Sequence, residues 1–188
     1  ASLDVTGATT LEGIEIIADG AIDVNIAVTV NTANTTITSD TDSVTFDSTV
    51  DSTGGFDLVV TADDNVTIEG ATTDFDNVSL TGTTGTVEVA NITNIANAIT
   101  LVGGTGITLD GTTYTSTGGA IAMTGAVLLA DNVVVTSGGG AGDDITFNNT
   151  IDGTFNLTLD AGAGGTVTLS DGVGDTGDDL ASLDVTGS

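Results

Sequence analysis

The chain has 188 residues and a formal net charge of −27, because it carries 27 acidic side chains and no Lys, Arg or His. Lys and Arg provide most affinity for nucleic acid, and an anionic membrane would repel this chain, so neither is expected as a partner. Cys is also absent. The usual general base, oxyanion clamp and activated thiol are therefore missing, and we expect no enzymatic activity and no required cofactor.

Short segments with alternating apolar and polar residues predict β-strands from one end of the chain to the other. Clear examples are residues 3–5, 22–26, 66–68 and 167–169. Thr is the most frequent residue, Pro is absent and 39% of the residues are hydrophobic. This composition favours strands with a buried face, and the fold class is all-β. Residues 90–98 are the exception, since their apolar spacing fits one helical turn or a loop equally well.

The strand signatures recur at intervals of about 20–24 residues, which is typical of a repeat architecture. The first series is Ile16, Ile37, Leu58, Val78, Ile99, Ile121, Ile145 and Val167. The second is Ile22, Val44, Val66, Val87, Ile107 and Val127. Two series in phase predict a coil of two or three short strands that stacks on the previous coil as a parallel β-solenoid. We expect about nine coils of about 20–22 residues, and a rod of about 43 Å.

One repeat is unambiguous, because the heptapeptide at residues 1–7 returns at residues 181–187. Neither end carries a charged or helical cap of the kind that protects the open edge of an isolated solenoid. We therefore expect residues 1–188 to be one continuous solenoid segment, with further copies of the repeat in the parent chain as its partners. The sequence leaves open whether chains also associate laterally or end to end. Membrane insertion is not expected, since no apolar run approaches a bilayer-spanning length.

The last third of the chain resembles a known repeat. Residues 142–153 read GDDITFNNTIDG, and residues 157–162 and 165–169 read LTLDAG and GTVTL. With the TTYTSTGG segment at 112–119, these are similar to repeats of filamentous-haemagglutinin-like giant bacterial surface adhesins. The similarity is clear over residues 103–187, whereas the first hundred residues share only the general character of these repeats. The resemblance implies a right-handed β-helix, export to the cell surface and an adhesive or structural role.

Calcium is the best ligand hypothesis. On the expected rod the charges lie about 1.6 Å apart, close to the spacing of about 1.7 Å in duplex DNA. Oxygen-rich turns with several carboxylates suit Ca²⁺, and the sites predicted for it are Asp143, Asp144, Asp175, Asp178 and Asp179. The simpler interpretation is a diffuse cloud of monovalent ions. Gly139–Asp144 starts like a calcium-binding nonapeptide, but Thr146 stands where the buried aliphatic residue belongs, so a solenoid turn is expected there.

The predicted function is a non-catalytic structural or adhesive stalk module of a long extracellular protein. An ice-binding solenoid is the main alternative, because a flat ladder of Thr could bind ice. However, the Thr-x-Thr pieces at 36–38, 81–83, 84–86, 113–115 and 166–168 do not recur once per coil, which argues against such a ladder. A carbohydrate-active β-helix enzyme is a remote alternative. The cleft of such an enzyme usually carries aromatic side chains that contact the sugar, and the sequence has only one Tyr and five Phe. Six Asn-x-Thr/Ser sequons are permissible glycan acceptors.

Overall fold

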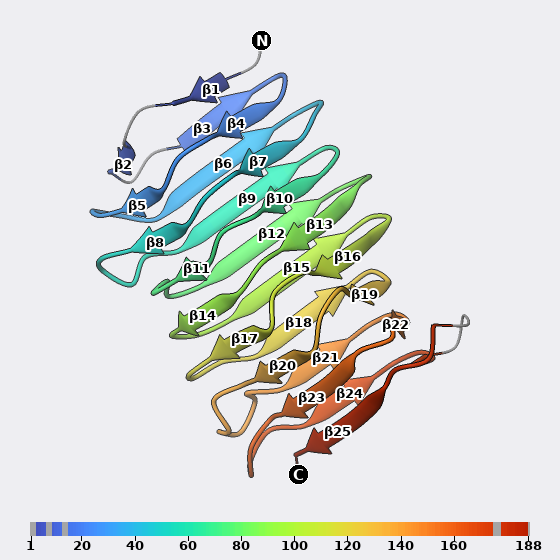
Figure 1. Ribbon diagram of the computed structural model, residues 1–188. Coiled ribbons are helices and arrows are strands. Elements are labelled where there is room, and N and C mark those ends of the chain that lie inside the picture. Colours follow the sequence, from blue (N-terminus) through green and yellow to red (C-terminus); the bar gives the residue numbers. More distant parts are fainter. Residues whose placement is uncertain (1–2, 7–8, 13–14, 175–177, 188) are drawn as a thin grey trace.

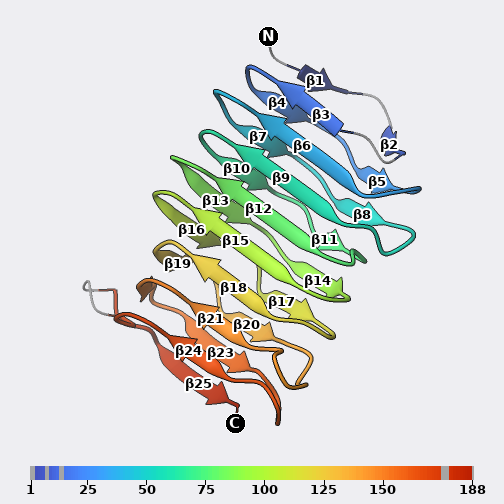
Figure 2. The same cartoon turned by 180° about the vertical axis from the view of Figure 1, so that it is seen from behind.

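The protein is a parallel β-solenoid in which each coil contributes one strand to each of three sheets (Figure 1). A computed structural model describes residues 3–6, 9–12, 15–174 and 178–187. Within these residues the regular structure is entirely β-strand. Seen from behind, the coils follow one another from the N-terminus to the C-terminus without interruption (Figure 2). The predicted all-β parallel solenoid is therefore confirmed.

Sheet A contains the first strand of each coil. Its members are β1 (Leu3–Val5), β4 (Ile22–Val24), β7 (Val44–Phe46), β10 (Val66–Ile68), β13 (Thr86–Val89), β16 (Gly106–Leu109), β19 (Val127–Leu129) and β22 (Ile151–Asp152).

Sheet B contains the second strand of each coil. Its members are β2 (Thr9–Leu11), β5 (Val28–Val30), β8 (Val50–Ser52), β11 (Thr72–Thr73), β14 (Ile92–Ile95), β17 (Thr113–Ser116), β20 (Val133–Thr136), β23 (Asn156–Asp160) and β25 (Ser182–Thr186).

Sheet C contains the third strand of each coil. Its members are β3 (Glu15–Ala18), β6 (Thr35–Ser39), β9 (Leu58–Ala62), β12 (Val78–Gly82), β15 (Ile99–Gly103), β18 (Ile121–Thr124), β21 (Ile145–Phe147) and β24 (Val167–Leu169).

The register of sheet A confirms the second apolar series. Val66 pairs with Val87, Val87 with Ile107 and Ile107 with Val127, and all four are buried. The first series is right from Ile16 to Ile37 and from Leu58 to Val167, but its step from Ile37 to Leu58 is wrong, because Ile37 pairs with Val60. Both alternatives point inward, so an alternating pattern cannot separate columns that lie two residues apart.

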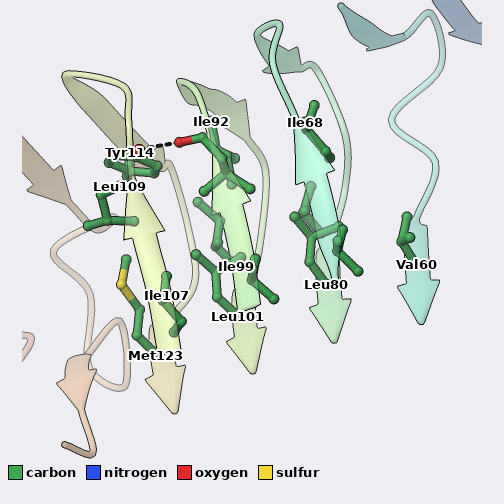
Figure 3. Packing of buried hydrophobic residues seen from close by; sticks show 14 of the residues in the cluster. Val60, Ile68, Leu80, Ile92, Ile99, Leu101, Ile107, Leu109, Tyr114 and Met123 are labelled. Atoms are coloured by element: carbon green, nitrogen blue, oxygen red, sulfur yellow. Dashed lines mark hydrogen bonds between the residues drawn. The ribbon is translucent and has the colours of Figure 1, made fainter. Parts of the chain in front are cut away.

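The interior is a stack of apolar columns, one residue per coil. Leu80, Leu101 and Met123 are successive members of one column of sheet C and are fully buried (Figure 3). Each such side chain contributes about 1.5–3 kcal/mol by leaving water. Phe46 and Phe147 also point inward, as their alternation predicts. The core therefore runs along the axis, and each coil depends on its neighbours for burial.

Within residues 90–98, Ile92–Ile95 form a strand with an irregularity, so the interpretation of the Ile92/Ile95 spacing as a helical turn or a loop was wrong. Ile92 and Ile95 are both buried in β14, and the register against β17 shifts between them. Asn94 takes up the extra residue with φ 58°, in the left-handed region that Asn tolerates. Asp74 has φ 64° at the same corner one coil earlier. A β-bulge gives apolar residues the three-residue spacing that resembles a helix.

The chain completes eight coils and part of a ninth, where nine were expected. Val173 continues sheet A through a single bridge to Ile151, and β25 continues sheet B by pairing with β23. The repeated heptapeptide thus takes two places: Leu3–Val5 belongs to sheet A, and Leu183 and Val185 belong to sheet B. The same short sequence fits either sheet, because all three demand the same alternation of inward apolar and outward polar residues.

Candidate interaction surfaces

Asp143 and Asp144 lie in the turn from β20 to β21, at the corner between sheets B and C. The Gly140 N–H donates to Asp143 Oδ2 at 2.8 Å, which closes the turn. The Thr166 N–H of the next coil donates to Asp144 Oδ1 at 2.8 Å. The solenoid turn predicted at residues 139–144 is confirmed, and one oxygen of each carboxylate binds a backbone N–H.

Asp178 and Asp179 lie on the opposite side of the rod, after β24. The Asp178 carbonyl accepts from the Gly153 N–H at 3.1 Å, and Asp178 faces sheet A. Asp175 lies outside the described residues. Asp143 and Asp144 therefore lie in a different turn from Asp178 and Asp179, and no group of three His, Cys, Asp or Glu side chains able to hold a metal is found among the described residues. Calcium binding at these residues stays a prediction.

Amide side chains take the place of basic partners for several carboxylates. Asp57 accepts from Asn34 Nδ2 and from Asn77 Nδ2, each at 2.7 Å, on the two neighbouring coils. Asn25 Nδ2 donates in the same way to Asp4 at 3.0 Å. These bonds satisfy acceptor oxygens without neutralising their charge, so neutralisation depends on ions from solution.

The sequon asparagines link one coil to the next. Asn65 Oδ1 accepts from the Thr86 N–H at 2.8 Å, and Asn77 Oδ1 accepts from the Ala98 N–H at 3.1 Å. Asn91 Oδ1 accepts from the N–H groups of Thr112 and Thr113, at 2.8 and 2.9 Å. This hydrogen-bonding role of Asn between coils was not predicted. Its signal is an Asn that recurs just before a strand, and the coil-to-coil bond explains why such Asn residues are frequent.

The outer surface of sheet C is an uncharged array of small side chains. In every strand from β6 onward the outward residues are Thr, Ser, Val or Ala. We call these residues the threonine face. They form two rows: Thr36, Val59, Ser79, Thr100, Ala122, Thr146 and Thr168; and Thr38, Thr61, Thr81, Val102 and Thr124.

This array corrects the expectation that no flat Thr ladder forms. The Thr-x-Thr pieces fail to recur once per coil because one of the two positions is often Ser, Val or Ala. Thr113 and Thr115 lie instead in sheet B. The spacing of the Thr-x-Thr pieces does not contain the interstrand register. This register aligns single Thr residues from successive coils into rows.

The acidic residues that lie within strands are nearly all on the other two sheets. Within strands of sheet C the one acid is Glu15, on β3. Sheets A and B carry acids at outward positions along their length: Asp4, Asp23, Glu88, Asp152, Asp51, Asp160 and Asp184. The strands of sheet C from β6 onward are therefore uncharged, whereas acids such as Asp57, Asp63 and Asp144 lie in the turns that border them.

A shallow hollow of about 340 Å³ lies on sheet A. Thr86, Thr108, Leu128, Asp152 and Asp178 are among its lining residues. Leu128 is 47% exposed there. Asp152 and Asp178 are the acidic residues among those that line it.

Tyr114 is buried in the core and carries no exposed chemistry. Its hydroxyl donates to the Val89 carbonyl at 2.8 Å and accepts from the Gly111 N–H at 3.0 Å. Burial raises the pKa of the phenol far above its ordinary value, although the Gly111 bond opposes the change and the Asp110 charge adds to it. The phenol thus stays protonated and ties two adjacent coils together.

Comparison with protein families, with characterised proteins and with solved structures finds no match for this chain. In the part of the chain that the structure describes, no helix is long and apolar enough to cross a membrane. The candidate functional features are therefore those of the rod itself: its continuous ladders, its acidic surfaces and the threonine face.

Proposed function

We propose that this chain is a non-catalytic stalk module of a long extracellular bacterial surface protein. The observation that carries the proposal is the unbroken parallel pairing of all three sheets through eight coils around one apolar core. A solenoid of this kind adds length with each coil, and neighbouring coils stabilise each other. Such a rod is suited to holding another part of a protein at a distance.

The chemistry of the surface agrees with this role. The sequence has no Lys, Arg, His or Cys, and Tyr114 is sealed in the core. The acidic surfaces repel one another and keep parallel rods apart in solution. Extracellular location, adhesion and end-to-end continuation into further copies rest on the resemblance to the adhesin repeats and on the repeated heptapeptide.

Solution scattering tests the stalk. Two copies of residues 1–180 joined head to tail should keep the cross-section of one copy and lengthen by about 4.8 Å per added coil. A flexible pair of beads, with a broad distribution of end-to-end distances, would contradict a stiff stalk. Two copies separated by a Gly/Ser linker are the control for that flexible behaviour.

A further inference from the structure

The threonine face combines three properties that a solvated stalk does not require. Its rows are periodic, since register-paired residues on adjacent strands lie about 4.8 Å apart and i, i+2 neighbours about 6.6 Å apart. It carries no charge from β6 to β24. Its side chains are small and of nearly equal height, with none larger than Val or Thr.

The hydroxyls of this face are available to water. Within the described residues, those of Thr38, Thr61 and Thr81 have no hydrogen-bond partner in the protein. Thr124 is bonded at the margin, where its Oγ1 accepts from Asn148 Nδ2 at 3.1 Å. The methyl groups of Thr and Val belong to the same two rows as these hydroxyls, so the face presents both apolar and hydrogen-bonding groups to water.

A protein partner fits this face poorly. Protein interfaces are anchored by aromatic, Met and Arg side chains, and the threonine face has none of them. Its seven strands have three to five residues each, and at about 16 Å² per residue the face covers roughly 500 Å². A stable interface buries about 800 Å² on each partner, so a second copy of this chain would be held weakly.

We propose that the threonine face binds ice. Ice is a neutral lattice of hydrogen-bond donors and acceptors whose flat planes repeat on the scale of these rows. Water held by the hydroxyls and ordered over the methyl groups can then join the lattice without rearrangement. A charged side chain would hold its own hydration shell, which is why the absence of acids from the outward positions of β6 to β24 in sheet C matters. This function does not depend on the stalk proposal.

The test is the thermal hysteresis of the purified chain, the gap between the melting and freezing temperatures of a seeded ice crystal. We expect a measurable gap and faceted crystals. Thr81→Tyr, in the middle of the second row, should remove most of the gap because the ring lifts the lattice off the face. Thr81→Val should keep most of it, since Val59 and Val102 already stand in the rows.

Thr67→Tyr is the matched control. Thr67 is a half-buried outward Thr of the same coil, on β10 of sheet A beside Thr45 and Glu88, and its change should leave the gap intact. Circular dichroism melting verifies that each variant folds. A wild-type chain without hysteresis would overturn the proposal, as would equal losses in Thr67→Tyr and Thr81→Tyr. Dimerisation in sedimentation that Thr81→Tyr abolishes, without hysteresis, would assign the face to a second copy instead.

Discussion

At the scale of single residues, the rod is sensitive to polar groups that its columns bury or bridge. Most inward positions are aliphatic, yet Thr72 is buried in the column between Val50 and Ile92. Its hydroxyl has no hydrogen-bond partner. In contrast, Asn91 and Tyr114 make bonds from one coil to another. Replacement of Thr72 by an apolar residue should therefore stabilise the protein, whereas loss of the bonds of Asn91 or Tyr114 should destabilise it.

Thr72→Val should stabilise the protein by about 1 kcal/mol, because it removes a buried unsatisfied hydroxyl and keeps the shape of the side chain. Urea unfolding followed by circular dichroism measures the difference. Thr73→Val is the control, since Thr73 points outward on the same strand and should change stability by less than about 0.5 kcal/mol. A destabilised Thr72→Val would mean that the hydroxyl has a partner.

Asn91→Ala should destabilise the protein by about 1–3 kcal/mol, because the N–H groups of Thr112 and Thr113 lose their acceptor. Asn91→Asp keeps an acceptor oxygen and should retain more stability than the Ala variant. Asn149→Ala serves as control, since Asn149 bonds only the adjacent Thr150 N–H. Equal effects at Asn91 and Asn149 in urea unfolding would show that the coil-to-coil bond contributes nothing.

The pKa of Tyr114 is raised in the folded chain by burial, so folding favours the protonated phenol. Its contribution to stability is present below the unfolded pKa of about 10 and declines as the pH rises above that value. We expect tyrosinate absorbance to appear together with unfolding in an alkaline titration. Ionisation of Tyr114 while the strand signal remains native would contradict its burial.

At the scale of elements, each strand is short and its stability comes from the strands before and after it. β10, β13 and β16 illustrate this, since Val66, Val87 and Ile107 bury one another along sheet A. The three-residue strands that dominate sheet A would not be stable alone. Damage in one strand should therefore spread along the axis instead of remaining local.

Val87→Asp should destabilise the protein by more than about 4 kcal/mol, because it places a charge without a partner in the core. Hydrogen exchange should accelerate in β10 and β16 as well as in β13. Thr100→Asp adds the same charge on the outside, beside Ser79 and Ala122, and should leave exchange unchanged. Accelerated exchange confined to β13 would contradict cooperative stacking.

At the scale of the whole molecule, 27 negative charges surround the rod and no basic side chain opposes them. Folding brings these charges closer together than they are in the unfolded chain. Self-repulsion therefore destabilises the compact state at low ionic strength. Carboxyl–amide bonds such as that of Asp57 with Asn77 orient the charges but do not cancel them.

Added salt should thus raise the melting temperature, because its ions screen the repulsion between the carboxylates. If Asp143, Asp144, Asp178 and Asp179 take part in calcium sites, CaCl₂ should stabilise more than NaCl of equal ionic strength. The added stability would be about 1.4 kcal/mol per site at tenfold saturation. Melting temperatures measured in chelator, in NaCl and in CaCl₂ test this prediction. Equal stabilisation by the two salts would mean that the ions form only a diffuse atmosphere and that the calcium sites do not exist.

The sequence by itself determined the class of fold and its period. Alternation of apolar and polar residues is a local property, and its recurrence about every 21 residues follows from the size of one coil. Hence the column from Val66 to Val127 was predicted correctly. The prediction that nucleic acid is not a partner also comes from composition alone, since charge does not depend on folding.

Only the tertiary structure decided the register, and with it the surfaces. A shift of two residues keeps every side chain on its face, so the pairing of Ile37 with Val60 could not be read from alternation. The bulge at Asn94 likewise requires the partner strand. The threonine face depends on the same information, because residues about 21 apart align only when their coils are stacked. The face is neutral because stacking places the uncharged outward residues of β6 to β24 side by side, although they lie far apart in the sequence.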